Sequence, residues 1–555
     1  MNLTTIYKYI FIGCGILLFS GHLKSQNNLL DPDFGVNGIV SFHPDYYQEA
    51  NKILLVNDSD YITVSVIHDT VFQFEDVILH RLNTQGDLVS NFGNNGAVRF
   101  DFPGMARSRP VDALVSGDSV IYILGMGLDS ASSFSRFCIS AFTIEGNVYS
   151  SFGSNGHISL SFYYNSELPA SITQQTDGKI LVAGLTYDSD TIPWEYPCIA
   201  RLNLDGSLDN NFGSTGKQIY DLMYGNIIAA GLGTIPENTS RHVGGGYFQS
   251  VIPLNDGRIF CGGGYHNGSN YEALLVMINH DGTVDSSFST GGKMILNYYP
   301  GLNQCFDEFL IQSNGKILSL MNYTPLNNNS HSDFHLFEFN PATHTLEDNN
   351  YDLNNTFDKA KGFVIDQNEK LWITGNMTYS NNFSAWYTSD FAFINSLIPA
   401  SGFWQNNVAF DTDGKAWFSS NAISGHQHNA SDIIIDGQNR IVVFGYTFKP
   451  SDPDFLSDLV LYRIENNFQN TVSAHENELQ ITVFPNPASD ELNIFTTQTG
   501  NKKINLFDLS GRKILEKNFL EQELKLNLSA FSSGMYQLSL TTENSVNTQL
   551  IIVNK

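Results

Sequence analysis

The sequence lacks the short motifs that identify common catalytic centres. It contains no Gly-x-Ser-x-Gly turn, no His-Glu-x-x-His pair and no Cys-x-x-Cys pair, which are typical of serine hydrolases, zinc proteases and thiol-redox or zinc sites. A pair of carboxylates for glycosidic cleavage cannot be recognised in a chain with 56 acidic residues. We therefore assign no catalytic residue from the sequence.

Cysteine is scarce as well, with 5 in 555 residues. Four of them, Cys138, Cys198, Cys261 and Cys305, follow the N-terminal leader described below, and four are too few for a disulfide scaffold in a chain of this length. Cys138 and Cys198 stand at equivalent places in apolar segments, so we expect them to be buried as small apolar residues. The sequence leaves the disulfide state of the four thiols open.

Basic residues are few, with 29 Lys and Arg against 56 Asp and Glu, so that the net charge is −27. Residues 1–25 carry +2 and residues 479–555 are neutral, so residues 26–478 carry −29. Such an acidic body argues against nucleic acid, whose phosphates need Lys and Arg partners, and against anionic lipid surfaces. We interpret the acidity as a solvated surface that keeps an exported protein soluble. Binding of Ca²⁺ by some of the aspartates is the alternative.

Long hydrophobic runs are absent except for one near the N-terminus. A lysine precedes an apolar stretch at residues 9–19, which is too short to span a bilayer as a helix. Together with the polar residues that follow, this stretch predicts a secretory signal peptide at residues 1–25, cleaved between Ser25 and Gln26. A lipoprotein signal at Cys14 is the alternative, but few apolar residues precede that cysteine.

A Phe-Gly block recurs along the chain with a period near 60 residues. In each copy it runs into an apolar segment, without the helix start and the lysine that a phosphate-binding loop needs. The phenylalanines lie 58, 60, 60 and 76 residues apart, at Phe34, Phe92, Phe152, Phe212 and Phe288. Self-similarity at this period predicts a solenoid or a propeller. We expect a buried Phe and a Gly-dependent turn in each repeat.

The third repeat contains four short β-rich segments and no helical period. Residues 171–175 and 179–184 flank an Asp-Gly turn, residues 198–203 form a third segment, and the Phe-Gly block leads into a fourth. Four antiparallel strands in each unit predict a propeller blade. The first hairpin turn can be followed at seven places along the chain, which predicts seven blades.

Glycine ends five of the predicted second strands. Because glycine has no side chain, we expect these positions to lie where two backbones approach closely, near the crowded axis of the propeller. The five residues are Gly125, Gly184, Gly262, Gly375 and Gly445.

The ends of the repeat array predict a closed ring. The first Phe-Gly block, at residues 30–42, precedes any complete repeat, and the last repeat stops near residue 464 without such a block. We expect the N-terminal strand to complete the seventh blade, because closure removes exposed sheet edges. An eighth blade around residues 410–417 is the alternative, but the 70 residues from Gly375 to Gly445 are too few for two blades.

This repeat pattern resembles the delta-60 repeat family of secreted bacterial proteins. The resemblance covers about residues 30–465 and fades after the first four copies, where residues 350–352 and 403–404 replace the Phe-Gly pair. It implies a propeller-like fold, here at residues 26–468, and no established catalytic residues. A polar stretch at residues 469–478 is expected to be a linker.

The C-terminal segment contains a Pro-Asn-Pro, a Ser-Gly-Arg and a Gly-Met-Tyr block. Their landmark residues are Pro485, Asn486, Pro487, Gly511, Gly534 and Tyr536. With these blocks, residues 479–555 resemble the type A C-terminal sorting domain of the type 9 secretion system of Bacteroidetes. The resemblance implies recognition by the translocon, export to the outer surface or the medium, and cleavage of the tail. Short alternating strands predict a small antiparallel β-sandwich.

Aspartate pairs are the candidate metal ligands. Ca²⁺ takes about six to eight oxygen ligands, and Asp31 with Asp33, or Asp411 with Asp413, can supply several from one loop. None of these pairs matches the EF-hand spacing, and aspartate also favours turns that hold no metal. The sequence indicates no other cofactor.

Two further segments are candidate sites. His426 and His428 alternate as two residues on one face of a strand do, but no third metal ligand can be identified, so we favour a polar loop. The insertion at residues 223–246 breaks the repeat period. It is either a functional loop or a tolerated surface insertion.

Together these features predict an all-β protein, a seven-bladed β-propeller followed by a small C-terminal β-sandwich. We expect an exported cell-surface or secreted binding protein whose ligand is a glycan or a protein, bound by variable loops on a rigid ring. The alternatives are a polysaccharide-degrading lyase or hydrolase on the same scaffold, and a structural surface component. The expected partners are the translocon and this ligand, without nucleic acid and without a transmembrane segment.

Overall fold

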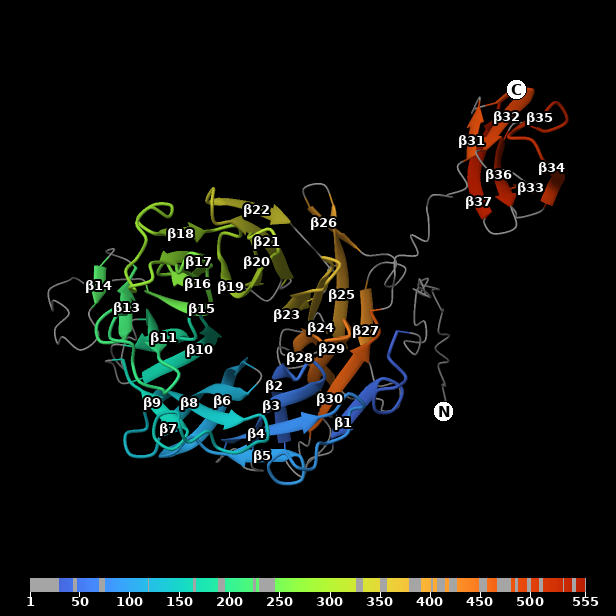
Figure 1. Cartoon of the computed structure of the whole chain (residues 1–555). Helices are drawn as coiled ribbons and strands as arrows, with labels where there is room; N and C mark the ends of the chain where they lie inside the picture. Colours follow the sequence, from blue (N-terminus) through green and yellow to red (C-terminus); the bar gives the residue numbers. More distant parts are fainter. Residues whose placement is uncertain are drawn as a thin grey trace, which may run out of the picture. The chain divides into compact units, whose positions relative to one another are not determined.

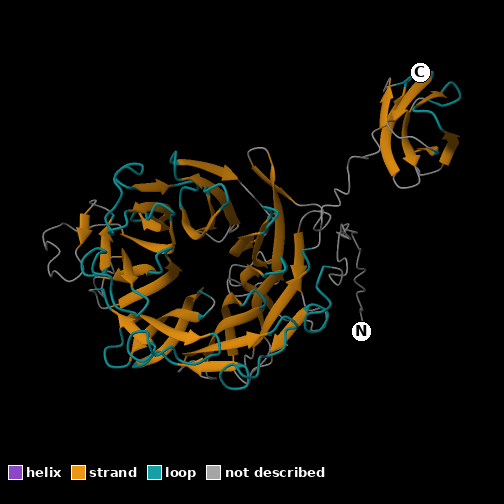
Figure 2. Cartoon of the chain, viewed as in Figure 1, coloured by secondary structure: helices purple, strands orange, loops and turns teal. Residues whose placement is uncertain are grey.

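The computed structural model of the chain is all-β in the residues that it describes. These are residues 29–42, 47–68, 75–117, 119–162, 166–187, 195–222, 226–228, 245–325, 333–349, 357–378, 391–400, 403–406, 415–418, 427–448, 457–466, 481–484, 488–496, 501–508, 513–532, 534–541 and 546–554. Every regular element within these ranges is a β-strand (Figure 2). The predicted signal cleavage site at Ser25 and Gln26 and the predicted linker at residues 469–478 lie outside them.

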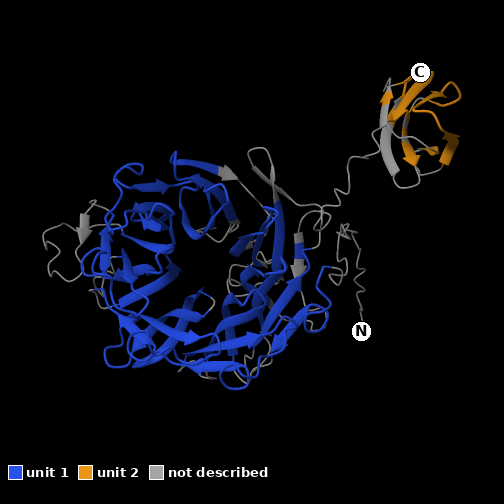
Figure 3. Cartoon of the chain, in the orientation of Figure 1, with its two compact units in different colours: residues 1–467 blue, residues 468–555 orange. Residues whose placement is uncertain are grey.

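The chain divides into two compact units, Met1–Asn467 and Phe468–Lys555 (Figure 3). Unit 1 is a series of antiparallel sheets of four or five strands, which follow one another around a common centre (Figure 1). One strand of each sheet lies nearest this centre, and each sheet is named below by that inner strand. Such a radial arrangement of four-stranded antiparallel sheets is a β-propeller.

In the first half of unit 1, the inner strand is the first strand of each sheet along the chain. The sheets are β2 (Tyr47–Val56), β3 (Asp60–His68), β4 (Glu75–Leu82) and β5 (Ala97–Phe100); β6 (Met105–Ser116), β7 (Val120–Asp129), β8 (Ser135–Thr143) and β9 (His157–Leu160); β10 (Ser166–Gln174), β11 (Ile180–Tyr187), β12 (Glu195–Leu202), β13 (Lys217–Asp221) and β14 (Asn226–Ile228); and β15 (Gly245–Pro253), β16 (Ile259–His266), β17 (Tyr271–Ile278) and β18 (Lys293–Leu296).

The sheets of the second half follow the same order. They are β19 (Leu302–Ile311), β20 (Ile317–Pro325), β21 (Asp333–Asn340) and β22 (Thr345–Asn349); β23 (Phe357–Ile365), β24 (Leu371–Thr378) and β25 (Phe391–Ala400), which pairs with both β26 (Phe403–Asn406) and β27 (Lys415–Phe418); and β28 (Gln427–Ile435), β29 (Ile441–Phe448), β30 (Ser457–Ile464) and β1 (Ile39–Phe42). The segment that suggested an additional blade therefore contributes β27 to the β23 sheet.

Strand β1 joins the two ends of the series. It pairs with β30 in antiparallel register, with Ile39 opposite Tyr462 and Phe42 opposite Leu459. The N-terminal strand thus completes the sheet of the last repeat, and this prediction is confirmed. The pairing covers the outer edge of β30, which would otherwise present unpaired backbone groups.

A buried ion pair reinforces this junction. The Nε of Arg463 lies 2.8 Å from Oδ2 of Asp31, and the two residues are 1% and 2% exposed. The guanidinium also lies over the ring of Phe34, 4.4 Å from its centroid, and donates a 3.3 Å hydrogen bond to the hydroxyl of Tyr61. A buried charge needs such a partner set, because desolvation makes an unpaired one costly.

The Phe-Gly block connects each repeat to the next. The phenylalanines of all five copies are 0% exposed. In the first four copies the following glycine has a positive φ, as at Gly93 with 52°, and its N–H donates to a turn carbonyl of the next repeat, as from Gly93 to Glu145 at 3.1 Å and from Gly153 to Asp205 at 2.7 Å. In the fifth copy Ser289 takes the place of this glycine. The prediction of a buried Phe and a Gly-dependent turn is confirmed in the first four copies.

A β-bulge recurs in the inner strands. The bulge residue of β10 is Ala170, between Pro169 and Ser171, and the partner strand places Gly184 opposite. A Cβ on Gly184 would lie 2.1 Å from the carbonyl oxygen of Leu168, so the predicted close backbone approach is present. Because a bulge redirects the side chains around it, it decides which residues face the centre of the ring.

The cysteines behave as apolar core residues. Cys138, Cys198 and Cys261 are buried, and Cys305 is half-buried; all four thiols are free. The expectation for Cys138 and Cys198 is therefore confirmed.

Unit 2 consists of two antiparallel sheets that share one apolar core. One sheet has the order β31 (Ile481–Phe484), β32 (Glu491–Thr496) and β35 (Glu523–Asn527), and the other has the order β34 (Lys513–Phe519), β33 (Lys502–Asp508), β36 (Gly534–Thr541) and β37 (Val546–Val553). Leu492 from the first sheet and Leu506 and Leu538 from the second are 0% exposed in the same core.

Replacing the turn glycine Gly93 by alanine should destabilise unit 1 strongly. A Cβ at this position would lie 2.3 Å from the carbonyl oxygen of Ala97, so we expect a loss of at least about 3 kcal/mol in the free energy of unfolding. Gly117 is the matched control, because its φ of 54° is nearly the same and no atom lies within 4 Å of its Cβ position. Gly117→Ala should cost only about 1 kcal/mol, for the left-handed backbone. Equal losses in urea unfolding would contradict this account.

Replacing Asp31 by asparagine should weaken the ring closure. The change leaves the Arg463 guanidinium buried without its carboxylate, which should lower the free energy of unfolding by about 3 kcal/mol. Chemical denaturation of the wild-type and variant chains measures the difference. Asp33→Asn is the control, because Asp33 is exposed and should change stability little.

Candidate functional site

A pocket of about 460 Å³ lies on the inner strands of three consecutive sheets, β6, β10 and β15. This volume falls within the range of roughly 300–1,000 Å³ that is usual for small-molecule sites. The lining is mainly apolar, with a few polar groups from the inner strands and from β12 and β17. The lining residues are Arg109, Val111, Met126, Leu168, Pro169, Ala170, Leu185, Glu195, Tyr247, Phe248, Gln249 and Tyr271.

The pocket lies over β10, whose side chains Ala170 and Leu168 are smaller than those at the equivalent positions of its neighbours. The bulge residue is Ala170 in β10, whereas it is Val111 in β6 and Gln249 in β15. The residue two positions before the bulge is Arg109 in β6 and Tyr247 in β15. The side chains of the flanking sheets therefore form walls around a hollow over β10.

A hydrogen-bonded tyrosine and carboxylate form the polar wall of the pocket. The hydroxyl of Tyr271 lies 2.8 Å from each of the two carboxylate oxygens of Glu195 and can donate to one of them. Tyr247 stands edge-to-face against Tyr271, with 5.4 Å between the ring centroids. Burial raises the pKa of Glu195, and the Tyr271 hydrogen bond opposes this shift. The arrangement presents aromatic surface next to a strong hydrogen-bond acceptor.

Arg109 forms the opposite wall and is held in place by two carboxylates. Its Nη2 lies 2.6 Å from Oε2 of Glu49, and its Nη1 lies 3.8 Å from Oε1 of Glu75. The side chain remains 40% exposed. A guanidinium fixed in this way keeps N–H donors available for a ligand.

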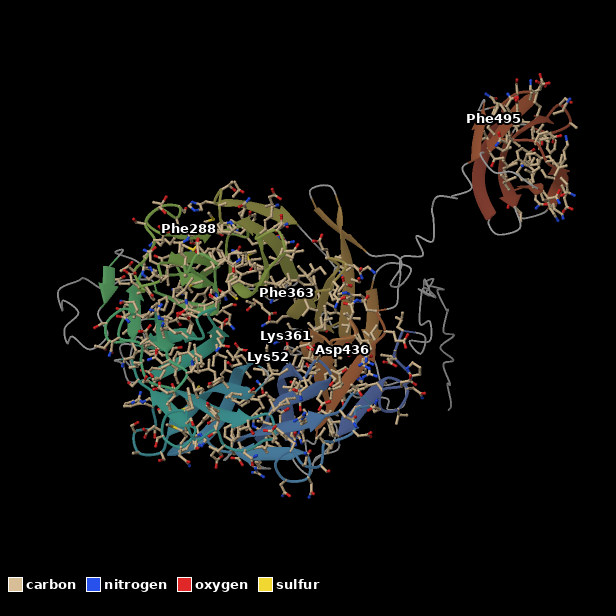
Figure 4. All side chains as sticks on the ribbon, viewed as in Figure 1. Lys52, Phe288, Lys361, Phe363, Asp436 and Phe495 are labelled. Atoms are coloured by element: carbon tan, nitrogen blue, oxygen red, sulfur yellow. The ribbon has the colours of Figure 1, made fainter. Side chains whose placement is uncertain are left out.

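A second charged group lies on the inner strands next to the bulges. Lys52 is directed toward the centre of the ring (Figure 4). Its Nζ lies 3.3 Å from Oδ1 of Asp432 and 3.7 Å from Oε1 of Glu308. Burial opposes protonation of Lys52, but these carboxylates and Asp112 raise its pKa overall. Burial raises the pKa of Glu308 to about 7, with Lys52 acting in the opposite direction.

The aspartates of this group also connect neighbouring sheets. Asp432 accepts a 2.9 Å hydrogen bond from the N–H of Ile53 in the β2 sheet, and Asp112 accepts one of 2.9 Å from the N–H of Ile172 in the β10 sheet. Their position after the bulge is equivalent in the two strands. We infer that this polar group stabilises the ring, whereas the pocket is the open site.

The aspartates that we considered for Ca²⁺ have different surroundings. Asp31 is bound by Arg463 and also lies 3.6 Å from Nη1 of Arg440, and its Oδ1 accepts the N–H of Asp33 at 2.9 Å. Asp411 and Asp413 lie outside the described residues. Within the described ranges, no group of three or more His, Cys, Asp or Glu side chains is placed to hold a metal ion.

The landmark residues of the C-terminal segment are partly described. Pro485, Asn486, Pro487 and Gly511 lie outside the described residues. Gly534 begins β36 and is exposed. Tyr536 is 8% exposed and its hydroxyl donates a 2.9 Å hydrogen bond to the carbonyl of Ser532.

The histidine pair and the insertion do not contribute to the described pocket lining. His428 is buried in β28 with its Nδ1 3.4 Å from the hydroxyl of Tyr462, whereas His426 lies outside the described residues. Most of the insertion at residues 223–246 is likewise outside them.

Sequence reasoning missed the pocket residues. Glu195, Tyr247 and Tyr271 are separated by up to 76 positions and share no motif. The charged residues of the inner strands could have been recognised in the sequence, because Lys52, Asp112 and their equivalents interrupt β-rich segments just before the hairpin turns. Their common position becomes clear only when the bulges align the strands.

Two family models match parts of the chain. Residues 482–554 match the secretion system C-terminal sorting domain, and residues 175–212 and 254–288 match a β-propeller domain of unknown function, DUF5122. No curated protein matches the sequence.

Three solved structures that match the chain have low sequence identity to it. A structure titled as PorZ, an essential bacterial surface component of the type-IX secretion system of Porphyromonas gingivalis, is 11% identical with a TM-score of 0.26, covering 91% of this chain and 75% of that one. A protein of unknown function from Dyadobacter fermentans is 10% identical with a TM-score of 0.35, covering 77% and 98%. A polysaccharide lyase, titled PL25 ulvan lyase, is 10% identical with a TM-score of 0.42, covering 75% and 95%.

The described residues include no helix with the length and apolarity needed to cross a bilayer. The sorting domain of the type 9 secretion system at residues 482–554 points to export and to an outer-surface or secreted location, and it implies an interaction with the secretion system. The radial sheets of the body are consistent with a β-propeller, and two stretches of it match a β-propeller domain of unknown function.

Proposed function

We propose that this protein is an exported binding protein that holds a glycan in the inner-strand pocket, at the cell surface or in the medium. The observation that carries the proposal is the pairing of Tyr247 and Tyr271 with the carboxylate of Glu195 in a pocket of about 460 Å³. Sugar rings combine apolar C–H faces with hydroxyl donors. Aromatic side chains fit the former, and a carboxylate accepts strong hydrogen bonds from the latter.

The proposed architecture divides the chain into four parts. Residues 1–25 are a signal peptide cleaved between Ser25 and Gln26, residues 26–468 a seven-bladed propeller of delta-60 repeats, residues 469–478 a linker, and residues 479–555 a type A sorting domain folded as a β-sandwich. The radial sheets and the pairing of β1 with β30 support the propeller part. The sorting-domain match supports the last part and a source in Bacteroidetes.

Replacing Glu195 by glutamine should weaken glycan binding. The amide keeps the shape of the side chain but loses the charge that strengthens hydrogen bonds from sugar hydroxyls, so we expect about a tenfold rise in Kd. The ligand is first identified on a broad glycan array with the purified full chain, with and without Ca²⁺. Titration calorimetry then compares the wild type with the variant.

Glu272→Gln is the matched control for this change. Glu272 is the next residue to Tyr271 in β17 and accepts hydrogen bonds from Asn267 and Asn297, and neighbouring residues of a strand face opposite sides. Its replacement should leave the Kd unchanged. Equal effects of the two variants, or an array without any glycan hit, would contradict the pocket as a glycan site.

Deleting residues 479–555 should stop export at the periplasm. The truncated chain keeps its signal peptide but lacks the segment that the secretion system recognises, so fractionation should find it inside the outer membrane. The wild-type chain, expressed at the same level, is the control and should appear at the surface or in the medium. Undiminished export of the truncated chain would refute the sorting assignment.

A further inference from the structure

Two lysines occupy the inner strand β23 of an otherwise acidic body. Residues 26–478 carry a net charge of −29, yet Lys359 and Lys361 are two residues apart on one strand and both are exposed. Lys361 is the bulge residue of β23, between Ala360 and Gly362. Figure 4 shows Lys361 directed toward the centre of the ring.

Two other cations of the inner strands form ion pairs, whereas Lys359 and Lys361 form none with a residue that the structure describes. Lys52 lies against Asp432 and Glu308, and Arg109 lies against Glu49 and Glu75. No carboxylate among the described residues lies within ion-pair distance of Lys359 or Lys361. The chain therefore places two like charges together without compensating them by direct contact in its described part.

The surroundings of Lys361 disfavour its charge in the absence of a ligand. The Lys361 side chain is exposed to solvent, but the protein that surrounds it inside the ring reduces its hydration. This desolvation and the neighbouring charge of Lys359 lower the pKa of Lys361 to about 8, although Asp307 of β19 and Glu49 of β2 act in the opposite direction. Asp307 itself is engaged by the amide of Asn322 at 2.6 Å. An anion that met both ammonium groups would relieve their repulsion and restore the charge of Lys361.

We propose that Lys359 and Lys361 form an anion subsite, which binds a carboxylate or sulfate substituent of the glycan whose sugar ring occupies the pocket over β10. Strand β23 lies across the centre of the ring from β10 (Figure 1), so a ligand held in the pocket can direct an acidic group toward these lysines. The inference deepens the proposed function and rests on it for the glycan. The anion subsite itself can be tested without any glycan.

Lysine reactivity in the purified full chain tests the subsite directly. Each lysine is acetylated by a brief pulse of an N-hydroxysuccinimide ester between pH 7 and pH 10, and mass spectrometry measures the extent at each position, with and without sodium sulfate at matched ionic strength. Only the neutral amine reacts. Without sulfate, Lys361 should become reactive as the pH rises through about 8, earlier than an ordinary lysine with a pKa near 10.4.

Sulfate should protect Lys361 selectively. A bound anion raises the pKa of a nearby ammonium by roughly one unit or more, which lowers the reactive fraction at pH 8 by about fivefold or more. Lys525, an exposed lysine of β35, is the reference and should not change. Equal behaviour of Lys361 and Lys525 on adding sulfate would overturn the subsite.

Glycan binding then distinguishes the two sources of the anionic group. The double variant Lys359→Gln, Lys361→Gln is compared with Lys179→Gln, which removes one charge at the turn before β11, for binding to a carboxylated, a sulfated and a neutral oligosaccharide of similar length. Selective loss of carboxylated or of sulfated binding, by about tenfold, identifies the substituent. An equal Kd for wild type and double variant with all three glycans would overturn the acidic-glycan assignment.

The two proposals fail in different ways. If Glu195→Gln has no effect on any glycan while sulfate still protects Lys361, the pocket assignment fails and the anion subsite stands. If Glu195→Gln weakens binding while sulfate protects no lysine, the glycan site stands and the anion subsite fails.

Discussion

The buried ion pair between Asp31 and Arg463 is the interaction on which the ring of unit 1 depends. It joins a residue that precedes β1 to the end of β30, which lie more than 400 positions apart in the sequence. Without this junction, β30 would be an open edge and the inner strands would have no common centre to face. The inner-strand pocket and the lysine pair both presuppose a closed series of sheets.

The β-bulge of the inner strands gives different uses to two successive backbone positions. In β10 the bulge residue is Ala170, and its small size leaves the pocket open. In β23 it is Lys361, which brings a charge to the same centre. The residue after the bulge, such as Asp112 or Asp432, bonds to the backbone of the next sheet. The residues of the proposed binding sites and the residues that connect the sheets therefore stand at neighbouring positions of the inner strands.

The net charge of the body contrasts with the basic residues found on its inner strands. The body is strongly acidic overall, which favours solubility for a protein whose sorting domain points to export. The centre holds paired groups, such as Lys52 with Asp432, and the lysines of β23, which have no carboxylate partner among the described residues. With the proposed anion subsite at these lysines, an acidic body that carries a local basic site favours specific over nonspecific contacts with anions.

Features that depend on neighbouring residues could be read from the amino-acid sequence alone. The Phe-Gly period, the Asp-Gly turns and the missing final block are local patterns, and from them followed the all-β class, the antiparallel four-stranded units and the closure of the ring by the N-terminal strand. The sorting blocks were readable for the same reason. Glycine at positions such as Gly184 also signalled a close backbone contact in advance.

The residues that meet at the centre became known only from the folded chain. Glu195, Tyr247 and Tyr271 come from three strands of two neighbouring sheets, so no spacing rule relates them. The role of Asp31 emerged in the same way, because its partner Arg463 lies at the far end of unit 1. Local backbone preferences determine strands and turns, whereas the closure of many sheets around one axis determines which side chains share a site.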